Sequence, residues 1–284
     1  YIFRGLREDL TFNFFASDFY SDAYTIDVLP SPALVDFEIA IDYPGYTKRI
    51  DETVKNTGDV TIPVGSKLNW TFSTRNAQRL SVVYGDSTYV LQSEEDLFRF
   101  TKTATTSMSY VVSTANEYIQ GRDSIMYRIQ VVPDLFPSIA VEEERDSSSL
   151  KLMYFTGEVK DDYGFKTLSF VYQRKSAEGV EGNWQREDIP VSKELTEDNF
   201  FFNWDMNSID LSPGDKLMYY FEVGDNDGVN GSKTSRSLMK EYALPTLEEM
   251  EVMVDQKNED IKEKLEESIK DAKKLEKELE ELQR

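Results

Sequence analysis

The chain has 284 residues and contains neither histidine nor cysteine. This composition excludes nucleophile-base pairs built on those side chains, zinc sites with thiolate or imidazole ligands, and disulfides. The 53 acidic residues outnumber the 32 basic ones and give a formal net charge of -21, so nucleic acid is not an expected partner. Aromatic residues make up 13% of the chain, a share that favours pleated sheets over a helical bundle.

The sequence also bears on the size and setting of the protein. No stretch approaches the roughly 18 to 20 apolar residues that a membrane-spanning helix requires. The chain opens at Tyr1 without a methionine or signal peptide and stops at Arg284 inside a helical pattern. We therefore expect a soluble segment of a longer protein, with room for about two domains.

A strand-like pattern that closes on a proline recurs along the chain. Residues 24–30 (Tyr-Thr-Ile-Asp-Val-Leu-Pro) match residues 127–133 (Tyr-Arg-Ile-Gln-Val-Val-Pro), and residues 239–245 repeat the apolar spacing and the proline. Each copy follows a second predicted strand, so the repeated unit is a β-hairpin; these strands lie at 10–16, 109–114 and 217–223. The spacing of about one hundred residues between prolines is that of an immunoglobulin-like sandwich.

The repeats predict a mainly β chain of tandem immunoglobulin-like β-sandwiches, followed by a C-terminal α-helix that starts a coiled coil. The predicted parts are a C-terminal hairpin of a preceding domain (1–29), two whole sandwiches (30–132 and 133–245) and a coiled-coil helix (246–284). Further strands are predicted at 35–43, 59–63, 67–73, 79–83, 87–91, 97–102, 138–141, 150–159, 167–174, 184–188 and 199–204.

After Pro245 the hydrophobic period changes from 2 to about 3.5 residues. One heptad position holds Leu247, Val254, Ile261, Ser268, Leu275 and Leu282, and another holds Leu265, Ala272 and Leu279. Thr246 is the predicted N-cap, with Glu248 and Glu249 at the positive end of the helix dipole. We expect the first turns to pack on the second sandwich or to stand free. A solvated single helix held by Glu-Lys pairs is the alternative to a coiled coil.

The loop at 224–232 alternates oxygen-bearing side chains with glycines. Asp225, Asp227 and Asn230 resemble the start of a calcium loop, although the distal glutamate of an EF-hand is missing. The same residue types suit a structured turn with positive φ angles. Calcium is the only cofactor that the sequence suggests, and the turn is the alternative.

A second acidic pair, Asp161 and Asp162, precedes Tyr163-Gly164 after a predicted strand. If this turn meets the 224–232 loop, the two carboxylates complete an oxygen cage for the calcium ion. Otherwise it is an ordinary Asp-Gly turn, which is the interpretation we favour from the sequence.

Aromatic residues are frequent enough to suggest a carbohydrate-stacking platform. The candidates are Trp70, Trp184 and Trp204, with the aromatic runs at 14–15, 200–202 and 219–220. Sandwich cores use aromatics at the same rate, so burial is the alternative. No phosphate-binding glycine loop, nucleophile elbow or metal-ligand helix is present, and we expect the chain not to be an enzyme.

Four segments in this order carry a family resemblance: Pro44-Gly45-Tyr46-Thr47, Asp161-Asp162-Tyr163-Gly164-Phe165, residues 225–231 and residues 244–250 with the helix that follows. They resemble large membrane proteins of Bacteroidetes grouped as a domain of unknown function, DUF4175. The resemblance implies membrane-spanning helices near the N-terminus, β-domains on the periplasmic side of the inner membrane and a long charged coiled coil. It implies no activity and no catalytic residues.

The sequence thus leads to two hypotheses. The first is a non-catalytic structural or adaptor segment of a membrane-anchored cell-envelope protein. Its sandwiches act as a spacer, residues 246–284 mediate self-association or bind a protein partner, and the membrane is reached only through segments outside this sequence. The alternative is a module that binds calcium or a glycan such as peptidoglycan, with the 225–232 loop as its site.

Overall fold

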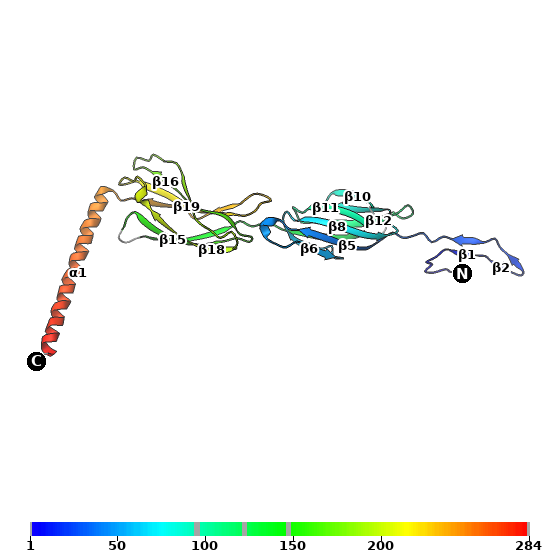
Figure 1. Ribbon diagram of the computed structural model, residues 1–284, viewed down its shortest axis with the longest axis horizontal. Helices are drawn as coiled ribbons and strands as arrows, with labels where there is room; N and C mark the ends of the chain where they lie inside the picture. The colour runs from blue at the N-terminus through cyan, green and yellow to red at the C-terminus, as the bar shows by residue number, and fades with distance from the viewer. Residues whose placement is uncertain (1, 94–96, 121–123, 146–148, 283–284) are drawn as a thin grey trace. The chain divides into compact units, whose positions relative to one another are not determined.

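The computed structural model describes residues 2–93, 97–120, 124–145 and 149–282. It shows a chain built mainly of β-strands, with one long C-terminal helix (Figure 1). The chain divides into two compact units, residues 1–134 with 228–230 and residues 135–227 with 231–284. The predicted mainly β fold is confirmed; the exact domain boundaries at 29, 132 and 245 stay predictions.

Two short hairpins precede the first sandwich. The strands are β1 (Leu10–Phe12) paired antiparallel with β4 (Tyr24–Ile26), and β2 (Phe15–Ala16) paired with β3 (Phe19–Tyr20). Ser17 and Asp18 both have positive φ, as a two-residue turn between right-twisted strands requires. The pairing of β1 with β4 agrees with a hairpin here, although its assignment to a preceding domain stays a prediction. The single strand predicted at 10–16 is wrong because it is broken at residues 13–14 into β1 and β2, which pair with different strands.

The first sandwich consists of two sheets, with strand orders β11-β8-β5-β6 and β10-β9-β12-β13-β7. All neighbouring strands are antiparallel except β7 and β13, which run parallel. The elements are β5 (Ala33–Asp42), η1 (Gly45–Thr47), β6 (Glu52–Lys55), β7 (Val60–Pro63), β8 (Lys67–Arg75), β9 (Arg79–Tyr84), β10 (Ser87–Gln92), β11 (Leu97–Thr103), β12 (Met108–Ala115) and β13 (Ser124–Val132).

Alternate residues of β8 form the centre of this sandwich. Leu68, Trp70 and Phe72 are all buried because successive side chains of a strand point to opposite faces. The indole Nε1 of Trp70 donates a hydrogen bond to Tyr110 Oη at 3.2 Å, and Tyr110 donates to the Gly58 carbonyl at 3.0 Å. The polar atoms of two large buried rings are thereby satisfied inside an apolar core.

The second sandwich also has two sheets, ordered β14-β15-β18 and β17-β16-β19-β20, and β21 pairs with β19 beyond β20. The elements are β14 (Ser138–Arg145), β15 (Leu152–Lys160), β16 (Phe165–Lys175), β17 (Gln185–Asp188), β18 (Glu197–Asp205), η2 (Met206–Ser208), β19 (Lys216–Asp225), β20 (Thr234–Arg236) and β21 (Lys240–Ala243). Phe170 lies at the centre of its core, with ring centroids 4.7 Å from Trp204, 4.8 Å from Phe202 and 4.9 Å from Phe221.

The C-terminal helix α1 (Leu247–Leu282) begins where the sequence predicts. Thr246 Oγ1 accepts a hydrogen bond from the Glu249 amide at 3.3 Å, and Glu249 Oε2 accepts one from the Thr246 amide at 2.8 Å. This reciprocal pair is a capping box. Met250 packs against the core of the second sandwich, so of the two alternatives left open by the sequence the first turn packs on the β-domain. Among the described residues, no helix is both long enough and apolar enough to cross a membrane.

We expect Tyr110→Phe to destabilise the first sandwich by about 1–3 kcal/mol, because the buried Trp70 Nε1–H loses its acceptor. Urea unfolding followed by circular dichroism measures the change. The control is Tyr118→Phe, whose side chain is 54% exposed, and it is expected to stay within about 0.5 kcal/mol. Equal effects of the two variants would contradict this account of the core.

Candidate functional site

The predicted calcium loop follows β19 and is built around a buried ion pair. Lys233 Nζ lies 2.9 Å from Asp225 Oδ2 and 3.3 Å from Asp227 Oδ2, and both carboxylates are completely buried. Asp225 Oδ1 also accepts hydrogen bonds from the amides of Lys233 at 2.8 Å and Asp227 at 3.2 Å. The ammonium group of Lys233 therefore takes the position between the two carboxylates that a bound cation would need.

The second acidic turn does meet this loop, contrary to the interpretation favoured from the sequence. The amide of Asn226 donates to the Gly164 carbonyl at 3.2 Å, and its Nδ2 donates to the Tyr163 carbonyl at 2.9 Å. The glycine has a φ of 115°, which other residues rarely adopt. From the sequence this meeting was the less favoured alternative, because the spacing of Asn226, the residue that joins the loops, does not mark it as a contact residue.

The carboxylates of the second turn are directed to backbone amides. Asp161 Oδ2 accepts from Tyr163 at 2.9 Å and Gly164 at 2.8 Å, and Asp162 Oδ2 accepts from Leu135 at 3.4 Å. Burial raises the pKa of Asp161; the two backbone hydrogen bonds oppose this change, and the charges of nearby Asp162 and Asp225 add to it. The contacts of Asp161 Oδ2 are those of an Asx turn. Its second oxygen, Oδ1, is buried and has no hydrogen-bond partner among the described residues.

The proposed ligand set is therefore only partly brought together. Asp161, Asp225 and Asp227 lie at the two joined loops, and Asn230 is an exposed residue. A calcium ion requires six to eight oxygen ligands. Across the described ranges, no group of three or more acidic side chains is placed to hold a metal ion. The calcium hypothesis stays a prediction, and the Lys233 ion pairs supply a competing explanation for Asp225 and Asp227.

We expect Lys233→Met to destabilise the second sandwich by about 3–5 kcal/mol, because two buried carboxylates lose their counter-charge. Thermal unfolding measures the loss of stability. Lys175→Met is the control, since Lys175 pairs with the exposed Glu181 at the surface. Millimolar calcium is expected to leave the melting temperature of the unchanged protein where it was. A rise with calcium concentration would instead support the calcium site.

The candidate stacking platform is largely buried. Trp70 and Trp204 are 1% and 2% exposed and belong to the two cores, so neither is available to stack on a sugar. Trp184 is 45% exposed and lies edge-on to Tyr220, and Phe201 is 63% exposed and stacks on Tyr154. Phe14 and Phe15, in the N-terminal segment, are 63% and 60% exposed. Glycan binding therefore stays a prediction that rests on these exposed rings.

Beside Trp184, a carboxylate lies between two arginines on the outer face of the β17-β16-β19-β20 sheet. Glu222 pairs with Arg186 through Oε1 and with Arg236 Nε through Oε2 at 2.7 Å. Burial acts to raise the pKa of Glu222, but the hydrogen bonds and charges of the two arginines outweigh it and lower the pKa. Arg236 also lies over the Tyr220 ring, 4.8 Å from its centroid. The network holds these side chains in place on the sheet.

We expect Glu222→Gln to lower the stability of the second sandwich at pH 7 by about 1–2 kcal/mol, because both guanidinium groups are half exposed and partly screened. A lowered folded-state pKa stabilises the fold above the unfolded pKa of about 4.3, and this contribution is lost as pH falls through the folded pKa. The difference in melting temperature between the two proteins should therefore shrink below about pH 4. A difference that is constant from pH 7 to 3 would contradict this.

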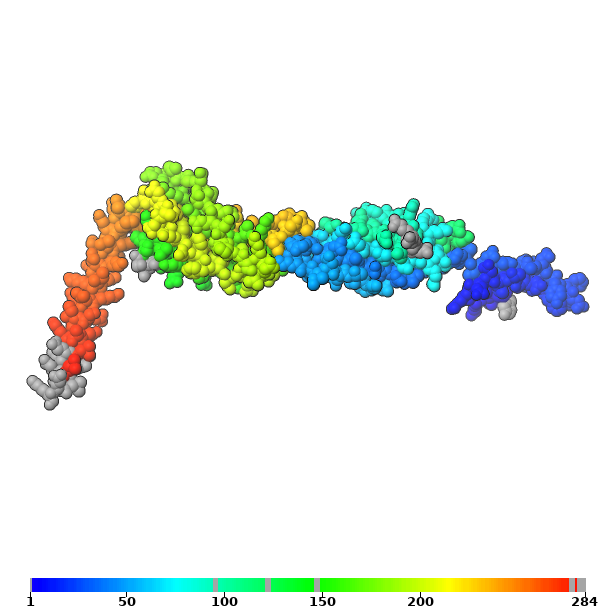
Figure 2. All heavy atoms as spheres, viewed as in Figure 1, coloured from blue at the N-terminus to red at the C-terminus, as the bar shows by residue number. Residues whose placement is uncertain are grey.

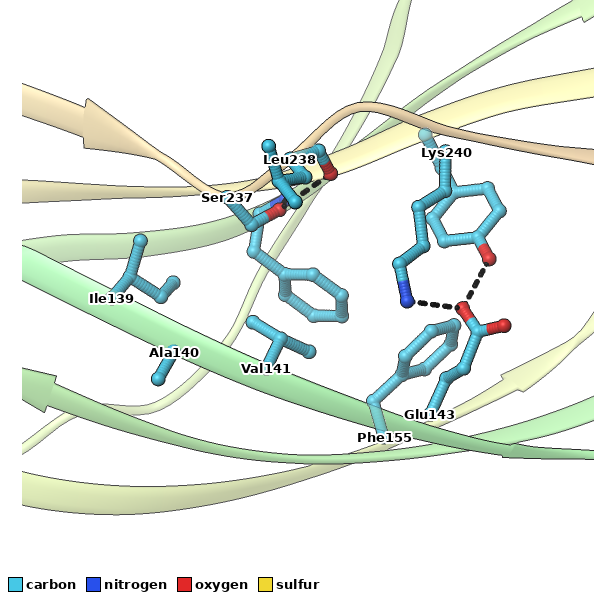
Figure 3. A pocket seen from close by; sticks show the side chains of 10 residues that line it. Ile139, Ala140, Val141, Glu143, Phe155, Ser237, Leu238 and Lys240 are labelled. Carbon is cyan, nitrogen blue, oxygen red and sulfur yellow. Dashed lines mark hydrogen bonds and ion pairs between the residues drawn. The ribbon is translucent and has the colours of Figure 1, made fainter.

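A groove of about 340 Å³ opens between the two sheets of the second sandwich, at the edge formed by β14 and by the chain between β20 and β21 (Figure 3). Its apolar lining comes from Ile139, Val141, Phe155, Phe221 and Leu238. At its polar end, Glu143 Oε2 accepts hydrogen bonds from Tyr219 Oη at 2.7 Å and Lys240 Nζ at 3.0 Å, both drawn in Figure 3. Sequence reasoning missed the groove because its lining alternates like any core strand.

Comparison with known families settles the classification. The sequence matches the domain of unknown function DUF4175 over residues 21–195, which is more than half of the chain. The chain belongs to the DUF4175 family. The match confirms the family resemblance seen in the turns at 44–47 and 161–165. A search of the curated proteins finds no match.

Solved structures similar to this DUF4175 chain include fibronectin(III)-like modules and a tandem-repeat region of an adhesion protein. One is the fibronectin(III)-like modules of Clostridium thermocellum CbhA, with 12% identity, 73% of this chain and 93% of that chain covered, and a TM-score of 0.23. Another is a tetra-tandem repeat from the extending region of a large adhesion protein, with 11% identity and a TM-score of 0.28. The match covers 78% of this chain and 69% of that chain. A third is latent PorU from Porphyromonas gingivalis, with 11% identity and a TM-score of 0.27. The match covers 77% of this chain and 20% of that chain.

Proposed function

We propose that this DUF4175 chain is a non-catalytic structural and adaptor segment of a membrane-anchored cell-envelope protein, on the periplasmic side of the inner membrane. The sandwiches serve as a spacer, and α1 associates with a second copy or with a helix of a protein partner. The exposed apolar side chains of α1 are the observation that carries the proposal.

Every described side chain of α1 from residue 251 to 275 is exposed, and the side chains stand at the surface in the space-filling view (Figure 2, orange to red). Ile261, Leu265, Leu275 and Leu279 are 56% to 61% exposed. They occupy the two heptad positions that form the contact face of a coiled coil. A solitary helix gains nothing from apolar residues at this spacing, whereas a paired helix buries them.

The spacer role is supported by the interior of each sandwich. Both cores are filled by large aromatic and branched side chains drawn from both sheets, and the largest buried residues include Trp70, Phe155 and Phe170. Domains with such cores keep their shape without a ligand. The sequence lacks histidine and cysteine, and the buried carboxylates Asp225 and Glu222 are paired with Lys233 and with two arginines. These features favour a structural role over catalysis.

We expect the chain to show a concentration-dependent increase in mass by light scattering, and Leu265→Lys to raise the dissociation constant at least tenfold. A charge at a coiled-coil core position loses its hydration when the helices pair. The control is Gln256→Lys, which adds the same charge to the exposed helix surface outside the two heptad positions. A protein that is monomeric at all concentrations, or equal weakening by both substitutions, would refute association through α1.

A further inference from the structure

The two sandwiches differ at the edge where the first and last strands of each domain come together. In the first sandwich, β7 continues after β6 and pairs in parallel with the last strand, β13, from Val60 opposite Ile129 to Pro63 opposite Val132. Val60 and Ile62 are 8% and 1% exposed and belong to the core. The first sandwich thus covers the edge of its last strand with a segment of its own chain.

The second sandwich has no counterpart of β7 among its described residues. The first strand, β14, pairs only with β15, and the two pieces of the last strand, β20 and β21, pair only with β19. An edge strand presents a row of backbone donors and acceptors that an additional strand can use. In the first sandwich, β6 covers the edge of the first strand and β7 covers the edge of the last strand. Among the described residues of the second sandwich, no strand pairs with either of these edges.

The groove of Figure 3 lies at this open position. Ile139 and Val141 line it from β14, and Phe221 lines it from β19. Between β20 and β21 the ladder is interrupted, because the Phe221 amide donates to Ser237 Oγ at 2.9 Å instead of to a backbone carbonyl. The residue that follows, Leu238, lies at the groove and is 83% exposed. An apolar cavity and an exposed leucine thus coincide with unpaired strand edges.

We propose that an extended segment of a partner protein binds in this groove as an added β-strand, in the position that β7 occupies in the first sandwich. As β7 pairs with β13, the backbone of this segment pairs with the open edge of the last strand, formed by β20, β21 and the chain between them. Its alternate apolar side chains enter the groove between Val141 and Leu238. Binding of this kind takes its affinity from main-chain hydrogen bonds and its specificity from pockets for alternate side chains.

The charges along β14 specify the partner further. Glu142 and Glu144 are exposed on the face of β14 opposite the groove lining, where they stand at the open edge beside the outward side chains of an added strand, and within the described part of the chain neither forms an ion pair. Glu143 is already paired with Lys240. An acidic segment, including one from another copy of a chain with a net charge of -21, is repelled here, whereas lysine or arginine beside the apolar residues is attracted. The expected ligand is a basic strand with alternating apolar residues.

This inference depends on the second sandwich alone and is independent of association through α1. The whole chain is used to select binders from a library of random twelve-residue peptides. The enriched sequences are then synthesised and titrated against the unchanged protein and the Leu238→Arg variant. Leu238 is 83% exposed, so its substitution leaves the fold intact. The matched control is Val180→Arg, at a residue that is 68% exposed and lies outside the groove lining.

We expect the enriched peptides to alternate apolar residues and to carry lysine or arginine. Leu238→Arg should weaken their binding at least tenfold, and Val180→Arg should leave it unchanged. Hydrogen exchange should show new protection of amides in residues 138–145 and 237–243 when peptide is bound. The inference is overturned if no peptide is enriched, if both variants bind equally, or if protection arises elsewhere in the chain.

Discussion

The burial of aromatic side chains between paired sheets is the interaction on which the rest of this structure depends. The chain has no cysteine, so no disulfide joins the sheets, and each sandwich is held by its core. Phe170 and Trp70 lie at the centres of the two aromatic clusters. Because successive side chains of a strand point to opposite faces, the same strands that build these cores also provide the polar outer faces of the sheets.

Both sandwiches have closely packed cores, and they differ in which strands cover the edges of their sheets. In the first, β6 covers the edge of β5 and β7 covers the edge of β13. In the second, the chain passes from β14 to β15 without such strands, and the edge carries a groove and three consecutive glutamates, 142–144. Charged edge residues hinder pairing between copies of the same chain while leaving the edge open to a segment of opposite charge.

Buried charge in the second sandwich is used to fix loops and side chains. Lys233 neutralises Asp225 and Asp227, and Asp215 pairs with Arg174 Nη2 at 2.8 Å while accepting the amides of Ala177 and Ser212. Removing one partner of such a pair costs more than the pair contributes, because the remaining charge stays buried. Loops rich in aspartate therefore resemble ion sites in sequence, but here their buried carboxylates pair with lysine and arginine side chains.

The sequence by itself determined the main strands of both sandwiches and the start of the helix, because period-2 alternation, turn residues and the Thr246-Glu249 cap act over a few neighbouring residues. It did not reveal β6 or the break between β1 and β2. It also determined the family, through the order of short turns. Only the tertiary structure decided that β7 runs parallel to β13, that Asn226 joins two loops and that Lys233 lies between two aspartates. It also decided which tryptophans are buried. These features depend on which distant segments come into contact, and the residue types and spacing within one segment do not specify that contact.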